Sequence, residues 1–212
     1  MTLDTRAISI KLLTRKISSL LLFTLALGVL SHQPLRASGV QPDRLFKQAF
    51  LPLPSPENPV IVSGSAGADG EYATLADAFS NIHVFDQTDS IISVIITGNT
   101  TEPSTGAILY QGNWVSLTVY PSGEYSVSGD AATALISLIG ADRVVIDGRI
   151  NLSGNSGLSL TNLNTGTSAS TILFSNSAGS NLVQFCNISG GSANASGGIV
   201  SFLTSSTSPG NT

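Results

Sequence analysis

Apolar residues recur along this chain with two periodicities, and each periodicity predicts a different type of secondary structure. Within residues 72–82 the apolar positions follow i, i+3, i+4 and i+7, which is one face of a helix. These positions are Leu75, Ala78, Phe79 and Ile82. Thr74 with Asp77 three residues later matches a capping box, so the helix is expected to begin at Thr74.

The rest of the pattern predicts strands. Short runs rich in Ile, Val and Leu are bounded by Gly, Asn, Ser or Pro, and several alternate between apolar and polar residues. The runs are residues 60–62, 91–97, 115–120, 134–139, 144–147, 170–174, 182–188 and 199–203. Because no helical segment separates them after residue 82, the pattern indicates an all-β body.

A β-sandwich and a β-solenoid both fit many short strands, and self-similarity favours the solenoid. Residues 135–148 and 173–186 share the order strand, small-residue turn, strand, at an offset of 38 residues. Residues 199–203 open a third copy 27 residues after the second. Such a loose period is expected where turns accept insertions, and residues 162–169 have the composition of one.

Three segments resemble a known superfamily. Residues 70–79, GEYATLADAF, resemble the capping helix of pectin-lyase-like proteins, and residues 139–148, IGADRVVIDG, resemble a recurrent rung of the same superfamily. Residues 96–103 resemble segments of bacterial surface β-helix proteins. The resemblance implies a right-handed parallel β-helix over residues 60–212 with an N-terminal amphipathic capping helix. Its motifs belong to a scaffold rather than to a reaction.

The repeat pattern stops at residues 206–212 without a second cap. Because a solenoid needs a cap at each end, we expect the sequence to be a fragment, incomplete at its C-terminus.

The basic and acidic residues are distributed unevenly along the chain. Charged residues make up 10% of the 212 residues, and five of the nine basic ones lie in the first 37 positions. Beyond them four basic residues face twelve acidic ones, a balance of 4 − 12 = −8. Since a surface of this sign repels phosphate backbones, nucleic acid is not an expected partner.

The first 37 residues have the layout of a secretory signal. A basic start precedes an apolar run at residues 17–30, and small residues permit cleavage after Ser31 or Ala37. An uncleaved signal anchor is the alternative, and it would be the one contact with a membrane. Residues 38–59 carry five prolines and predict a stiff linker. The expected location is therefore secreted or in the cell envelope.

Four aromatic residues within 16 positions are candidates for binding sugar rings. They are Tyr110, Trp114, Tyr120 and Tyr125. Aromatic faces that stack on sugars and aromatic side chains that cover the core beneath the cap both fit this cluster.

Asp147 with Arg149 is the candidate ionic group. The pair fits binding of a uronate or internal pairing, and the interpretation of Asp147 as a turn residue is favoured over a role in binding. His83 beside the helix end and the lone Cys186 in an apolar run are interpreted as structural. With one cysteine, no cysteine zinc site and no disulfide within the chain can form. No paired-Asp motif or Gly-His-Gly run is present. We therefore expect no catalytic residues, no metal and no cofactor.

These observations favour an exported, non-catalytic β-helix protein that binds or adheres to polysaccharide or cell-surface glycan. One alternative is a polysaccharide lyase or hydrolase whose catalytic coils lie beyond residue 212. The other is a structural stalk that spaces further modules from a surface.

Overall fold

The computed structural model describes residues 57–193 and 198–203. The predicted signal segment and the linker as far as residue 56 lie outside the described residues. The described chain is mostly β, with one α-helix, α1 (Leu75–Ile82), and a 3-10 turn at Ile150–Leu152. The strands are β1 (Val60–Ser63), β2 (Gly70–Tyr72), β3 (Ile91–Ile96), β4 (Thr100–Glu102), β5 (Ala107–Tyr110), β6 (Ser116–Pro121), β7 (Tyr125–Gly129), β8 (Ala134–Ile139), β9 (Val144–Asp147), β10 (Leu158–Asn162), β11 (Ser170–Ser175), β12 (Leu182–Gln184), β13 (Asn187–Gly190) and β14 (Val200–Phe202).

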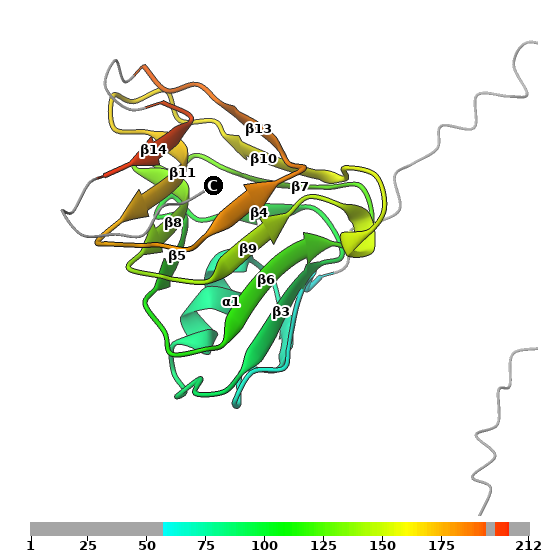
Figure 1. Cartoon of the computed structure of the whole chain (residues 1–212). Helices are drawn as coiled ribbons and strands as arrows, with labels where there is room; N and C mark the ends of the chain where they lie inside the picture. The colour runs from blue at the N-terminus through cyan, green and yellow to red at the C-terminus, as the bar shows by residue number, and fades with distance from the viewer. Residues whose placement is uncertain (1–56, 194–197, 204–212) are drawn as a thin grey trace, which may run out of the picture. The chain divides into compact units, whose positions relative to one another are not determined.

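The strands wind into four stacked coils with three parallel sheets (Figure 1). Each coil gives one strand to each sheet: β3, β6, β9 and β12 to sheet A, β4, β7, β10 and β13 to sheet B, and β5, β8, β11 and β14 to sheet C. Strands β1 and β2 extend sheet A before the first coil with antiparallel pairing. This is a parallel β-helix, as the sequence predicts.

Helix α1 forms as its pattern predicts. Thr74 is its N-cap, and the Thr74 hydroxyl accepts a hydrogen bond from the Asp77 amide. All four apolar positions of the predicted face are buried, and they join the hydrophobic core. The helix packs against β1, β2, β4 and β5, so it covers the first coil of the described stack (Figure 1).

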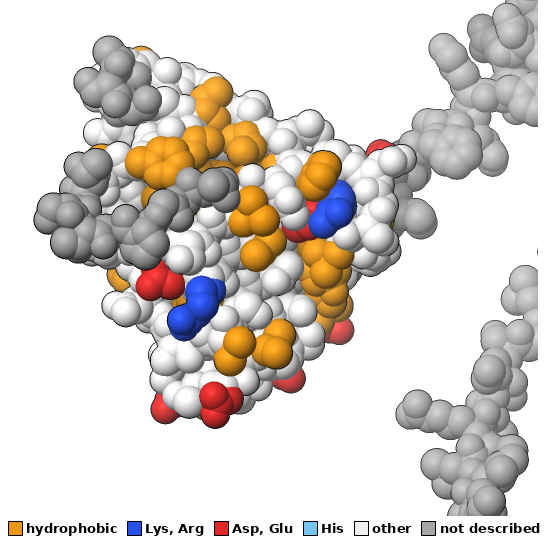
Figure 2. All heavy atoms as spheres, viewed as in Figure 1, with side chains coloured by type: hydrophobic (Ala, Val, Ile, Leu, Met, Phe, Trp, Pro, Cys, Tyr) orange, Lys and Arg blue, Asp and Glu red, His pale blue; other side chains and the backbone are white. Residues whose placement is uncertain are grey.

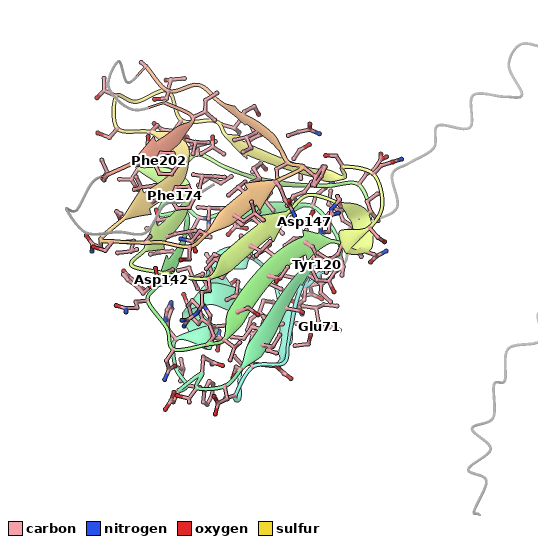
Figure 3. All side chains as sticks on the ribbon, viewed as in Figure 1. Glu71, Tyr120, Asp142, Asp147, Phe174 and Phe202 are labelled. Atoms are coloured by element: carbon pink, nitrogen blue, oxygen red, sulfur yellow. The ribbon has the colours of Figure 1, made fainter. Side chains whose placement is uncertain are left out.

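Inward side chains stack from coil to coil and form the core. In sheet C, Leu109, Leu138, Phe174 and Phe202 occupy one register position on successive strands. The rings of Phe174 and Phe202 lie parallel, with centroids 4.8 Å apart (Figure 3). Because each strand contributes only two or three inward residues, the fold depends on such ladders rather than on any single strand.

The structure corrects the predicted register. Ile136 pairs with Ile172, 36 residues later, and Val145 pairs with Leu182, 37 residues later, so the predicted offset of 38 is wrong. The reason is that β8 is buried at all but its last position, and such a nearly continuous buried run does not reveal which residues point inward. Likewise Ile172 pairs with Val200, 28 residues later, where the sequence predicted 27.

The strand predicted at residues 182–188 is two strands, β12 and β13, separated by a corner at Phe185. Phe185 has φ 54°, in the left-handed region, which ends β12. Strands β2, β4, β5, β7 and β10 have no counterpart in the predicted set. β4 (Thr-Thr-Glu) has no apolar residue, and β7 and β10 each place two apolar or aromatic residues among Ser, Thr, Asn or Gly, so their pattern resembles that of loops. β5 (Ala-Ile-Leu-Tyr) is a run of only four residues. Of the insertion predicted at 162–169, residues 163–169 form the loop between β10 and β11, and Asn162 ends β10.

Candidate functional site

The predicted aromatic cluster is divided among the sides of the β-helix. Tyr110 ends β5 in sheet C, Tyr120 lies on β6 in sheet A, and Tyr125 begins β7 in sheet B. The chain turns a corner between each of these strands. The three tyrosines are therefore close in sequence but do not form one platform.

Trp114 is a core residue and not a sugar platform. Its side chain is 0% exposed, and its indole Nε1 donates to the carbonyl of Asp142 at 2.8 Å. Gly112 lies directly against the ring, so closely that a Cβ at this position would be 2.1 Å from it. Of the two interpretations of Trp114 the structure supports packing, because a ring enclosed on both faces cannot stack on a ligand.

Asp147 and Arg149 form an internal ion pair. Arg149 Nη2 lies 2.5 Å from Asp147 Oδ2, and Arg149 Nε lies 3.0 Å from Oδ1. Gln184 Nε2 also donates to Oδ2, at 2.9 Å. Asp147 is 2% exposed, and these donors, with Arg149 first, hold the pKa of its carboxyl below the usual value. The guanidinium also lies 4.7 Å from the Phe185 ring centroid. Of the alternatives considered from the sequence, the structure therefore contains internal pairing of Asp147 with Arg149.

Tyr120 lies beside this ion pair on the outer side of sheet A. Thr118 and Val119 on β6 pair with Val145 and Ile146 on β9, and one step further along this register Tyr120 lies opposite Asp147 (Figure 3). The Tyr120 side chain is partly exposed. Cys186 is close to the same carboxylate, and burial followed by the charge of Asp147 raises the pKa of its thiol to about 12. Such a thiol stays protonated at neutral pH, in agreement with a packing role.

A hollow of about 460 Å³ opens between α1 and β5, and we call it the Tyr110 hollow. Its lining includes Asp77, Ser80 and His83 from the helix, Thr105 from the β4–β5 loop, and Ile108 and Tyr110 from β5. Tyr110 is 51% exposed and Asp77 and Ser80 are exposed as well. The hollow therefore combines an accessible aromatic ring, a carboxylate and hydroxyl groups, which are the usual elements of a small polar ligand site.

His83 fixes the position of Tyr110 in this hollow. Its Nε2 accepts a hydrogen bond from the Tyr110 backbone N–H at 2.8 Å, and its ring meets the Tyr110 ring edge-on at a centroid distance of 5.5 Å. Burial lowers the pKa of His83. Because a nitrogen that accepts a hydrogen bond carries no proton, the imidazole is neutral, with its proton on Nδ1.

A second hollow, of about 430 Å³, lies on sheet B, and we call it the sheet B hollow. Its lining includes Asn99, Glu124, Tyr125, Ser126, Ser159 and Asn187. Tyr125 is partly buried and packs against the core, and its ring lies over Gly123. Tyr125 thus borders the hollow with a ring that is only partly exposed.

Sequence reasoning did not identify the polar residues of either hollow. Asp77 and His83 were interpreted only as parts of the helix and its end. Ser126 and Ser159 lie outside the predicted strands, and Asn187 lies within the predicted strand 182–188 but was not considered as a site residue. The available signal was alternation, since Ser126, Ser159 and Asn187 each precede a core-facing Val127, Leu160 or Ile188 by one position.

Comparison with known protein families, with curated proteins and with solved structures finds no match. Among residues 57–193 and 198–203, no group of three His, Cys, Asp or Glu side chains is placed to hold a metal ion. In the same ranges no helix is long and apolar enough to cross a membrane.

Proposed function

We propose that this chain is an exported, non-catalytic protein of the pectin-lyase-like β-helix kind that binds glycans through the Tyr110 hollow. The observation that carries the proposal is the exposed ring of Tyr110 beside the exposed carboxylate of Asp77 in one hollow. The partner is a polysaccharide or a cell-surface glycan.

The chemistry of the hollow suits a sugar ring. A pyranose has an apolar C–H face and a polar rim of hydroxyls, and a tyrosine ring likewise offers apolar area with a polar tip. Ile108 extends the apolar side of the hollow next to Tyr110. Asp77 supplies an acceptor for sugar hydroxyls. Its Oδ2 accepts a hydrogen bond from the Thr74 hydroxyl, while its Oδ1 makes no hydrogen bond within the described residues.

The charges of the described residues disfavour phosphate-containing ligands and nucleic acids. Eleven carboxylates face only two basic side chains, Arg143 and Arg149. Arg149 pairs with Asp147, and Arg143 Nη2 donates to the carbonyl of Trp114 at 2.6 Å. Figure 2 accordingly shows two separate blue groups, each beside a red one, and no basic patch on this face. A polyanion therefore finds no cationic surface there.

The location outside the cytoplasm rests on the sequence. The basic start, the apolar run at residues 17–30 and the small residues that follow it are typical of a secretory signal. Glycans of the cell surface and its surroundings are then the accessible ligands.

Binding of the purified full chain to a panel of oligosaccharides, measured by calorimetric titration, tests the proposal. We expect at least one binder, and we expect Tyr110→Ala to weaken it by about tenfold or more. Tyr120→Ala on sheet A is the matched control and should bind as the unaltered chain does. Absence of binding to the whole panel, or turnover of a bound glycan into shorter products, would contradict the proposal.

A further inference from the structure

The lining of the Tyr110 hollow carries a negative charge without a positive one. Asp77 is its one carboxylate, and the two basic side chains of the described residues, Arg143 and Arg149, both lie outside the lining. His83 also borders the hollow, and its imidazole is neutral because Nε2 accepts a hydrogen bond from the Tyr110 amide. The hollow therefore favours a cation over an anion.

Two hydrogen bonds with Thr74 hold the Asp77 carboxylate in place. The Thr74 hydroxyl donates to Asp77 Oδ2 at 2.7 Å and accepts from the Asp77 amide at 3.0 Å, which fixes the residue in the first turn of α1. The Asp77 side chain is exposed, and its Oδ1 makes no hydrogen bond within the described residues. Because the carboxylate is already oriented, Oδ1 can accept from a cationic donor with little further loss of side-chain entropy.

The positive end of α1 offers no free amide to an anion. Glu102 accepts from the amides of Leu75 and Ala76, and the Asp77 amide donates to the N-cap hydroxyl. Glu102 is buried next to Ala76, which itself borders the hollow. Burial raises the pKa of Glu102, and the charge of Asp77 contributes in the same direction, so the two carboxylates are within electrostatic reach of each other. The helix end therefore does not cancel the negative charge of the hollow.

The exposed ring of Tyr110 adds a second attraction for a cation. The residue is 51% exposed, and His83 fixes it through the hydrogen bond from its amide and the edge-on ring contact. An ammonium group over an aromatic face is attracted by the quadrupole of the ring. The same face suits the C–H side of a sugar ring. A ligand with both an ammonium group and a pyranose ring would therefore use the carboxylate and the aromatic ring together.

We infer that the ligand of the Tyr110 hollow is a glycan with free amino groups, in which a protonated hexosamine places its ammonium on Asp77 Oδ1 and its ring against Tyr110. The inference rests on the proposed function and narrows it from glycans in general to a cationic class. Uronates and sulfated sugars are disfavoured, because they would bring a second negative charge beside Asp77. N-acetylated sugars lose the ion pair, because their nitrogen carries no charge.

The test compares two probes on the full chain by calorimetric titration, in a mildly acidic buffer of low salt. The probes are chitosan oligosaccharides and fully N-acetylated chitin oligosaccharides of equal length. They share the sugar ring and the linkage and differ at the nitrogen, which is charged only in the first.

Two variants with the same change in net charge locate the effect. Asp77→Asn removes the charge from the hollow and keeps an oxygen that can accept from the Thr74 hydroxyl. Glu71→Gln is the matched control, since Glu71 is exposed on β2 in sheet A and does not line the hollow (Figure 3). Melting temperatures show that both variants are folded.

For the unaltered chain we expect the free-amine oligosaccharide to bind about tenfold more tightly than its acetylated counterpart, and we expect added salt to reduce this difference. Asp77→Asn should abolish the difference, whereas Glu71→Gln should keep it. Equal binding of the two probes by the unaltered chain would overturn the inference whatever the variants do. A difference that survives in folded Asp77→Asn would overturn it as well.

Tyr110→Ala separates failure of this inference from failure of the proposed function. If Tyr110→Ala weakens both probes equally and acetylation makes no difference, the proposed function stands and the amino-sugar class is refuted. If neither probe binds to the unaltered chain, the amino-sugar class is refuted, and the panel titration decides the proposed function by itself.

Discussion

The carboxylate of Glu102 on β4 accepts hydrogen bonds from the backbone amides of Leu75 and Ala76, at 3.0 and 2.8 Å, in the first turn of α1. These amides have no partner within a helix, and a negative charge near them is favourable. Glu102 is 4% exposed. A residue from the first coil thus ties the capping helix to the β-helix across 27 positions of sequence.

Removal of the Glu102 carboxylate should weaken the attachment of α1 to the β-helix and lower the stability of the fold. Glu102→Ala leaves one buried and one partly buried amide without acceptors, and we expect it to lower the free energy of unfolding by about 1–3 kcal/mol. Glu102→Gln keeps one acceptor oxygen and should lower the free energy of unfolding by less than Glu102→Ala does. Chemical denaturation of the three chains measures this order, and equal stability of the alanine variant and the unaltered chain would contradict it.

Glu102 also predicts the sign of one pH effect. Burial raises the pKa of its carboxyl in the fold, despite the two amide hydrogen bonds that oppose the shift. The folded chain then binds this proton more tightly than the unfolded chain does. The contribution of Glu102 to stability is therefore present below its ordinary pKa and is lost as pH rises through the raised value. Glu102→Gln should remove this decline, which denaturation curves at a series of pH values would reveal.

His83 should give a pH effect of the opposite sign. Burial lowers the pKa of His83, and protonation of its Nε2 would break the hydrogen bond from the Tyr110 amide. The contribution of His83 is thus present above its ordinary pKa of 6.5 and is lost as pH falls through the lowered value. We expect the melting temperature to fall in this window for the unaltered chain and to stay level for His83→Gln, which retains His32. A parallel fall in both chains would exclude this role for His83.

Arg149 should matter for stability and not for glycan binding. Arg149→Ala leaves the buried carboxylate of Asp147 with Gln184 and the backbone as its donors. Because the arginine side chain is about one third exposed, solvent moderates the loss, and we expect only a small fall in the melting temperature. Affinity for every glycan probe should be unchanged. A tenfold loss of binding with unchanged stability would instead restore the direct role in uronate binding considered from the sequence.

Gly106 should tolerate no side chain. It has φ +70°, and a Cβ there would lie 2.0 Å from the carbonyl oxygen of Ala134 in the next coil. Gly106→Ala combines backbone strain with a clash against backbone, and we expect a loss of more than about 2 kcal/mol. Gly70→Ala is the control, since its Cβ would lie at ordinary contact distance, 3.8 Å from the Tyr72 hydroxyl oxygen. Thermal unfolding of both variants checks the difference.

The sequence by itself determined the helix and those strands whose formation depends only on residues close together in the chain. The face of α1, its start at Thr74 and the strands β8 and β9 follow from spacing and capping within a few residues, and the structure has them at the predicted positions. The alternation of apolar and polar residues indicated strands, because a strand with one buried face repeats every second residue. The self-similarity of residues 135–148 and 173–186 then favoured a β-solenoid over a β-sandwich.

Only the tertiary structure decided which residues meet. Ser126 and Ser159 lie side by side although 33 residues separate them, while Tyr120 and Tyr125 lie on different sheets although only five do. Burial also assigned Trp114 to the core and Asp147 to an internal ion pair. The physical reason is that neighbours across coils are set by where each corner falls, and corners depend on turn geometry and loop length. The hydrophobic pattern of short strands leaves both of these open.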